Sequence, residues 1–124
     1  MDETSDEGGL SIGCRLWIIW PGGARLGPGR VALLEAIGTH GSLKRAAEAL
    51  GLSYRAAWNR IERLNALAER PLVAAAVGGA QGGRSHLTPA GAAAVRAYRA
   101  VEAETRALHA RIATETTVRE APNA

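Results

Sequence analysis

The residues best suited to chemistry in this chain are polar side chains that recur along one predicted helix, which starts after Ser53. Arg55, Asn59 and Arg63 follow at four-residue spacing, so they share one face of that helix. A guanidinium pairs with O6 and N7 of guanine, and a carboxamide pairs with N6 and N7 of adenine. The spacing therefore predicts a helix in the DNA major groove, with Arg55 and Asn59 on base edges and Arg63 on phosphate.

The opposite face of the same helix is apolar and is expected to face a core. Its members recur at helical spacing: Ala57, Ile61, Leu64 and Ala68. Trp58 lies on the flank of the polar face, where a large apolar ring is unusual unless it is used. Most charged helix faces only contact solvent. If this face is considered by itself, a solvated surface with no ligand remains the alternative.

Two earlier segments position this helix. Pro28 and an apolar stripe predict a first helix over residues 28–39. Ser42 is an expected N-cap for a second helix that ends at Gly51, where a positive φ closes the turn. Ser53 then caps the third helix. This order predicts a helix-turn-helix.

A glycine-rich hairpin is predicted after the third helix, which Pro71 closes. Residues 72–77 and 84–87 are expected strands, with the tip at residues 78–83. The tip resembles a phosphate-binding Walker loop, but a strand follows it where that loop needs a helix. We therefore interpret the hairpin as a wing. Arg84 on it, and Lys44 on the second helix, are expected to contact DNA phosphates.

Thr88 and Pro89 begin a long predicted helix that reaches about residue 114. Its apolar positions alternate by four and three residues: Ala94, Tyr98, Val101, Thr105, Leu108 and Ile112. This seam can pack on its own domain or on a second copy of the chain. Such a helix is about 37 Å long at ~1.5 Å per residue, which favours a homodimer. The fold class is mainly α: a winged helix-turn-helix with a β-hairpin wing and a long C-terminal dimerisation helix.

Composition narrows the remaining classes. The 124 residues carry a net charge of +3, although four of the 12 acids crowd the segment from Asp2 to Glu7. We expect a disordered acidic tail over residues 1–9, one domain over residues 10–114 and a frayed tail over residues 115–124. Neither a signal peptide nor a run of ~18 apolar residues is present, which predicts a soluble cytoplasmic protein with no membrane partner.

No arrangement of residues predicts an enzyme. Cys14 is the only cysteine, and the three histidines lie far apart in sequence, which argues against a metal site. No nucleophile, base and acid occur in a catalytic pattern. We expect no catalytic residue, no metal and no cofactor.

Beyond these patterns, the sequence resembles a known family. The residues that carry the likeness are the run from Gly51 to Trp58, the glycine-rich tip and the run Leu87-Thr88-Pro89-Ala90-Gly91. They resemble the DNA-binding domain of molybdate-responsive, ModE-type transcription regulators and, more distantly, the LysR-type helix-turn-helix. The resemblance implies a dimeric bacterial regulator that binds double-stranded DNA. The DNA contacts that it implies are Ser53, Tyr54, Arg55, Trp58, Asn59, Arg63 and, in the wing, Arg84.

One departure from that family affects the expected function. Its full-length members carry C-terminal domains that bind oxyanions, and nothing after the long helix would form such a site in this chain. We therefore expect either a stand-alone short member or a DNA-binding fragment, a regulator with no effector domain and no small-molecule effector site in this chain. The alternative is a winged-helix protein–protein interaction module that docks through Trp58.

Overall fold

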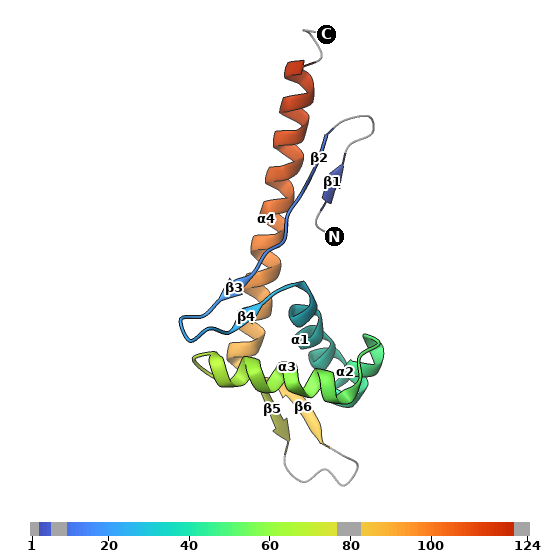
Figure 1. Ribbon diagram of the computed structural model, residues 1–124, viewed down its shortest axis with the longest axis vertical. Helices are drawn as coiled ribbons and strands as arrows, with labels where there is room; N and C mark the ends of the chain where they lie inside the picture. The colour runs from blue at the N-terminus through green and yellow to red at the C-terminus, as the bar shows by residue number, and fades with distance from the viewer. Residues whose placement is uncertain (1–2, 6–9, 77–82, 121–124) are drawn as a thin grey trace. The chain divides into compact units, whose positions relative to one another are not determined.

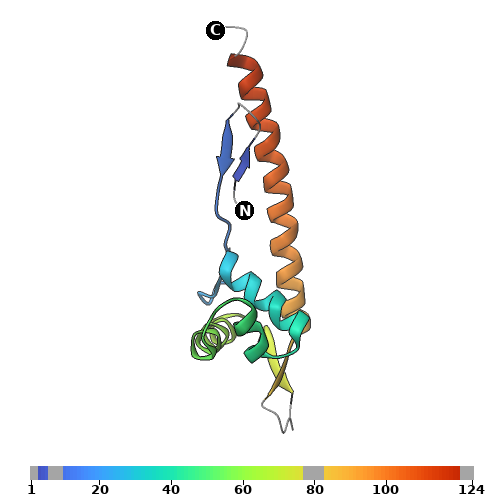
Figure 2. The same cartoon turned by 90° about the vertical axis from the view of Figure 1, so that its right-hand side faces the viewer.

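In the computed structural model, residues 3–5, 10–76 and 83–120 are described (Figures 1 and 2). The chain divides into two compact units, Trp17–Tyr98 and a second unit made of Met1–Leu16 with Arg99–Ala124.

The larger unit, Trp17–Tyr98, contains the predicted helix-turn-helix. Its helices are α1 (Pro28–His40), α2 (Leu43–Ala49) and α3 (Tyr54–Leu67). The predicted starts are thus confirmed. Aliphatic side chains and one tyrosine fill the core, with the largest fully buried being Leu26, Val31, Leu33, Leu34, Ile37, Leu64, Leu72 and Tyr98.

Local hydrogen bonds end α2 and begin α3 within a few residues. The N–H of Gly51 donates to the carbonyl of Glu48 at 3.2 Å, and the N–H of Leu52 donates to that of Ala47 at 2.8 Å. These two bonds form a Schellman motif, which needs the positive φ of 69° that Gly51 adopts. Ser53 then accepts the N–H of Ala56 at 3.0 Å and caps α3. The turn predicted from Gly51 and the cap predicted at Ser53 are both confirmed.

Two hairpins accompany these helices. Strands β3 (Ile18–Ile19) and β4 (Arg25–Leu26) pair in antiparallel register before α1. The wing consists of β5 (Val73–Ala76) and β6 (Arg84–Leu87), with Val73 opposite Leu87. The N–H of Ser85 donates to the carbonyl of Gly41 at 2.9 Å, which ties the wing to the end of α1. Most of the predicted glycine-rich tip lies outside the described residues.

Helix α4 (Pro89–Glu120) begins where the sequence places it. The Thr88 hydroxyl accepts the N–H of Gly91 at 3.0 Å and donates to the carbonyl of Pro71 at 2.6 Å. The helix continues past residue 114, the expected end. No glycine or proline interrupts the sequence from residue 92 to residue 120, and an Arg111–Glu115 ion pair at 3.9 Å supports the extra turns.

In the smaller unit, β1 (Glu3–Ser5) pairs with β2 (Ser11–Gly13) in antiparallel register. Residues 1–9 were expected to be disordered, so the strand at Glu3–Ser5 differs from that expectation; residues 1–2 and 6–9 lie outside the described part. Backbone pairing with β2 explains the difference, because a strand of three residues leaves no clear periodic signal.

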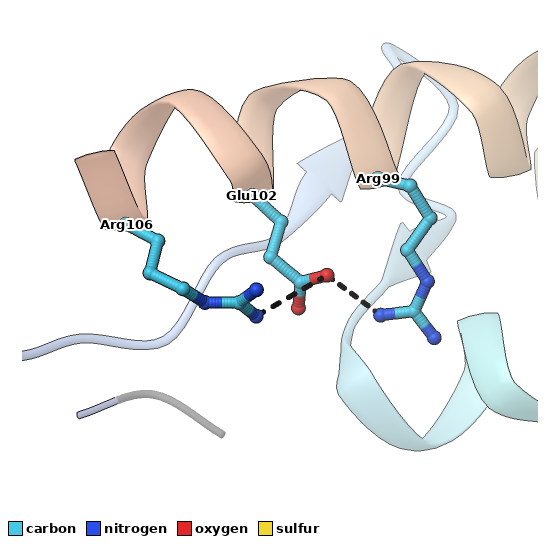
Figure 3. Close-up of polar contacts among 3 residues, drawn as sticks. All are labelled: Arg99, Glu102 and Arg106. Carbon is cyan, nitrogen blue, oxygen red and sulfur yellow. Dashed lines mark hydrogen bonds and ion pairs between the residues drawn. The ribbon is translucent and has the colours of Figure 1, made fainter. Parts of the chain in front are cut away.

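One acidic side chain is buried in this smaller unit. The Glu102 carboxylate accepts a hydrogen bond from Arg99 at 2.8 Å and pairs with Arg106 at 3.9 Å (Figure 3). The three residues lie on successive turns of α4, so each arginine can reach the same oxygen. A carboxylate removed from water is tolerated when it is paired in this way.

Candidate nucleic-acid interface

The polar face predicted for α3 is exposed, and the opposite face is buried. Ala57, Ile61 and Leu64 belong to the core, whereas Arg55, Asn59, Glu62 and Arg63 are exposed. The apolar stripe therefore anchors the helix and leaves the hydrogen-bonding groups free for a ligand. Figure 1 shows α3 crossing the unit beside α1 and α2, with the wing strands next to it.

Large aromatic side chains remain accessible at the N-terminal half of α3. Tyr54 is 55% exposed and Trp58 is 39% exposed. The Arg55 guanidinium carbon lies 5.8 Å from the centre of the Trp58 ring. This cation–π contact restricts the long arginine side chain before any ligand binds. Trp58 thus acts as a support for Arg55.

The remaining predicted contacts are distributed over three elements of the same unit. Lys44 is exposed on α2, Arg84 is exposed on β6, and Ser53 is exposed just before α3. The Ser53 hydroxyl already accepts the N–H of Ala56. Its hydrogen atom is free to be donated, so the cap and a DNA contact are compatible.

Asn65 has a structural role that the sequence did not assign. Its side-chain oxygen accepts the N–H groups of Leu72 at 2.8 Å and Val73 at 3.3 Å, and its amide donates to the Val73 carbonyl at 2.9 Å. These bonds join the C-terminal half of α3 to the start of the wing. Asn65 therefore helps to fix the position of the wing beside α3, together with the Ser85–Gly41 backbone bond.

Positive charge is also concentrated around Arg30, at a place that no sequence pattern indicated. Partial burial lowers the pKa of Arg30 from its ordinary value, and the charges of Arg60, Arg63 and Arg25 lower it further. Arg25 and Arg30 were not predicted to belong to a site. One feature of the sequence could have drawn attention to Arg30. It lies in the first turn of a predicted helix, where the helix dipole disfavours a cation.

The helix-turn-helix is similar to a known family. The family model for bacterial regulatory helix-turn-helix proteins of the lysR family matches residues 29–92, from α1 to the first turn of α4. The chain belongs to this family. The matched part holds α3 and both wing strands, so this LysR-family helix-turn-helix includes nearly all of the candidate interface.

Curated relatives agree with this family. The chain is 53% identical over 104 residues to the molybdenum-pterin-binding protein MopB of Rhodobacter capsulatus, covering 83% of this chain and 38% of MopB. It is 49% identical over 82 residues to the molybdenum transport protein ModE of Azotobacter vinelandii, covering 66% and 30%. The transcriptional dual regulator ModE of Escherichia coli K12 is 39% identical over 71 residues, covering 57% and 27%. The chain spans about a third of the length of these relatives. The ModE-type likeness of this LysR-family helix-turn-helix is thereby confirmed.

One further property concerns membranes. Within the described residues, no helix combines the length and the apolar character that crossing a bilayer requires.

Proposed function

We propose that this LysR-family protein is a sequence-specific transcription regulator that binds double-stranded DNA as a homodimer. The observation that carries the proposal is the exposed face of α3. It presents Arg55, Asn59 and Arg63 along one line while the opposite face is buried. A recognition helix needs both properties, since it must be fixed to its domain and open to the groove.

Each contact has a distinct role in this proposal. Arg55 pairs with guanine and Asn59 pairs with adenine in the major groove. Arg63, Lys44 and Arg84 neutralise phosphates, which fix the position of the protein on the duplex. Tyr54 and Trp58 border the base-reading end of α3. The Ser53 hydroxyl donates a hydrogen bond to the DNA backbone.

Selection of bound sites from random duplex DNA tests this function. The expected result is one enriched motif whose affinity falls steeply with salt, because bound phosphates release counterions. No enrichment would contradict the proposal. A protein-interaction module would instead lose its partner on Trp58→Ala and keep it after substitution of Arg55 or Arg63.

The homodimer is proposed from the C-terminal part of α4. Val101, Leu108 and Ile112 recur at seven- and four-residue spacing, and each is at least 40% exposed in the single chain. A line of large aliphatic side chains on a charged helix is typical of a helix–helix seam. A two-fold dimer then predicts two half-sites in inverted orientation, about one helical turn apart or a multiple of that spacing.

Sedimentation equilibrium tests the dimer directly. Leu108→Glu should shift the chain to monomer, because a charge would be buried in the seam. Ala107→Glu, on the neighbouring exposed position, is the matched control and should leave the dimer intact. A dimer unaffected by Leu108→Glu would contradict this seam.

The names of the relatives suggest the genes that are controlled. MopB is described as molybdenum-pterin-binding, and the Azotobacter protein as a molybdenum transport protein. We include in the proposal that this chain regulates genes of molybdenum metabolism. The selected motif should then occur upstream of such genes, and its absence there would refute this part alone.

A further inference from the structure

Four arginines gather beside the C-terminal half of α3, and they come from three different elements. They are Arg25 on β4, Arg30 in the first turn of α1, and Arg60 and Arg63 on α3; we call them the arginine cluster. Within residues 3–5, 10–76 and 83–120, no carboxylate forms an ion pair with any of the four. Among the residues that the structure describes, the cluster therefore concentrates positive charge with no ion-paired carboxylate.

The β3–β4 hairpin holds Arg25 in this place. Leu26 is fully buried, and its neighbour Arg25 is exposed, as alternation along a strand requires. The Arg25 guanidinium carbon lies 5.4 Å from the centre of the Trp17 ring. That ring packs on Gly27, where an added Cβ would meet the indole nitrogen at 2.6 Å. Arg25 is thus held beside the residue that precedes α1.

The same hairpin also contacts α3. A Cβ added to Gly22 in its turn would approach the carbonyl oxygen of Leu67 to 2.5 Å. Arg60 and Arg63 flank the buried residues Ile61 and Leu64, which fix the register of α3 in the core. The backbones that carry the four arginines are therefore fixed relative to one another before any ligand binds.

The spacing along α3 connects the cluster to the base-reading end. Arg63 follows Arg55 by eight residues, about 12 Å at ~1.5 Å per residue. The DNA major groove is also about 12 Å wide. A helix with Arg55 on the bases can therefore bring Arg63 to the strand that borders the groove.

We propose that the arginine cluster clamps backbone phosphate of that bordering strand, with Arg25 and Arg30 as contacts additional to those of α3. This clamp rests on the DNA binding proposed above. A guanidinium can hold phosphate through two parallel hydrogen bonds. The four like charges repel one another in the free protein, and a polyanion removes that repulsion. A duplex fits the cluster better than an acidic protein does, because Arg63 shares its face of α3 with Arg55 and Asn59.

Salt dependence of DNA binding by the full chain tests the clamp. The variants are Arg25→Gln, Arg30→Gln and Arg30→Lys, measured on a duplex that the unmodified chain selected. Each glutamine variant should weaken binding to all sequences alike. It should also reduce the slope of log K against log salt by about 0.9 for each chain bound. Arg30→Lys keeps the charge and should keep the slope.

Arg96→Gln is the matched control, since Arg96 is exposed on α4 in the same unit and does not affect the pKa of Arg30. Its salt slope should equal that of the unmodified chain. A second measurement is the melting temperature of the free protein at low salt. Arg30→Gln should raise this melting temperature, because one repelling charge is removed. If Arg30 only supported the fold, the same substitution would lower the melting temperature.

The two proposals fail in different ways. If the unmodified chain selects a motif but Arg25→Gln and Arg30→Gln keep its salt slope, the clamp is wrong and the regulator stands. Binding of an acidic protein that is lost in the same variants, with DNA binding unchanged, would also overturn the clamp. If the unmodified chain binds no duplex, the proposed function itself is wrong, and the clamp is wrong with it.

Discussion

Asn59 and Asn65 lie on the same helix, yet their surroundings are opposite. Asn59 is exposed and, within the described part of the chain, has no hydrogen-bond partner on its side chain. Asn65 is half-buried, and its side-chain oxygen and nitrogen both form hydrogen bonds with the backbone of residues 72 and 73. The N-terminal half of α3 is thus open to a ligand, while the C-terminal half is fixed to the wing. A recognition helix needs one part that is open to DNA and another part that is fixed to its domain.

The largest expected difference between the two halves is in stability. Asn65→Ala should lower the free energy of unfolding by roughly 3 kcal/mol, because it leaves backbone groups of Leu72 and Val73 without partners. Asn59→Ala should change it by less than about 0.5 kcal/mol, as is usual for exposed positions. Urea unfolding measures both. Equal urea midpoints for the two variants would show that Asn65 contributes no more to stability than Asn59 does.

The next prediction compares two exposed arginines. Arg55→Ala should weaken binding to the selected site by about 1–3 kcal/mol and relax the preference at one base pair. Arg63→Ala should weaken binding to every sequence alike, since a phosphate contact carries no sequence information. Repeating the site selection with each variant separates the two effects. An unchanged motif from Arg55→Ala would show that this residue does not read a base.

Substitution of Trp58 should affect DNA affinity less, and only through Arg55. Trp58→Leu keeps an apolar side chain but removes the ring that Arg55 contacts at 5.8 Å, and it should weaken specific binding by about 0.5–1 kcal/mol. In an Arg55→Ala background the same substitution should have no further effect. A double-mutant cycle measured by fluorescence anisotropy tests this. Additive effects would mean that Trp58 contacts DNA independently of Arg55.

Local signals in the sequence predicted much of this architecture. Pro28, Ser42, Gly51, Ser53 and Thr88 determine where helices begin or end through short-range hydrogen bonds, so their roles can be predicted without a fold. The polar and apolar faces of α3 followed from periodicity for the same reason.

Other features depend on contacts between distant segments. The arginine cluster joins Arg25 and Arg30 to Arg60 and Arg63 across about 30 residues, and no local pattern reports that approach. The three hydrogen bonds of Asn65 likewise require the wing to be in place. The sequence therefore predicted which face of α3 is exposed, but it did not predict the side chains that fix that face or add charge beside it.

The smallest prediction concerns the one acid on the open face of α3. Glu62 is exposed beside Arg55 and Asn59, where it would repel the phosphates of a bound duplex. Two unit charges about 8 Å apart in water interact by about 0.5 kcal/mol. Glu62→Gln should therefore tighten binding roughly twofold at low salt, and the gain should fade as salt screens it.

Glu104→Gln, an exposed acid on α4 outside the unit that contains α3, is the matched control and should leave the dissociation constant unchanged. The pair of variants measures whether α3 itself faces the duplex. If Glu62→Gln weakened binding, its carboxylate would be a contact to the DNA, as expected where an acid accepts a hydrogen bond from the cytosine amino group. The base-reading set would then extend from Arg55 and Asn59 to Glu62, and the open half of α3 would continue one turn further toward the arginine cluster.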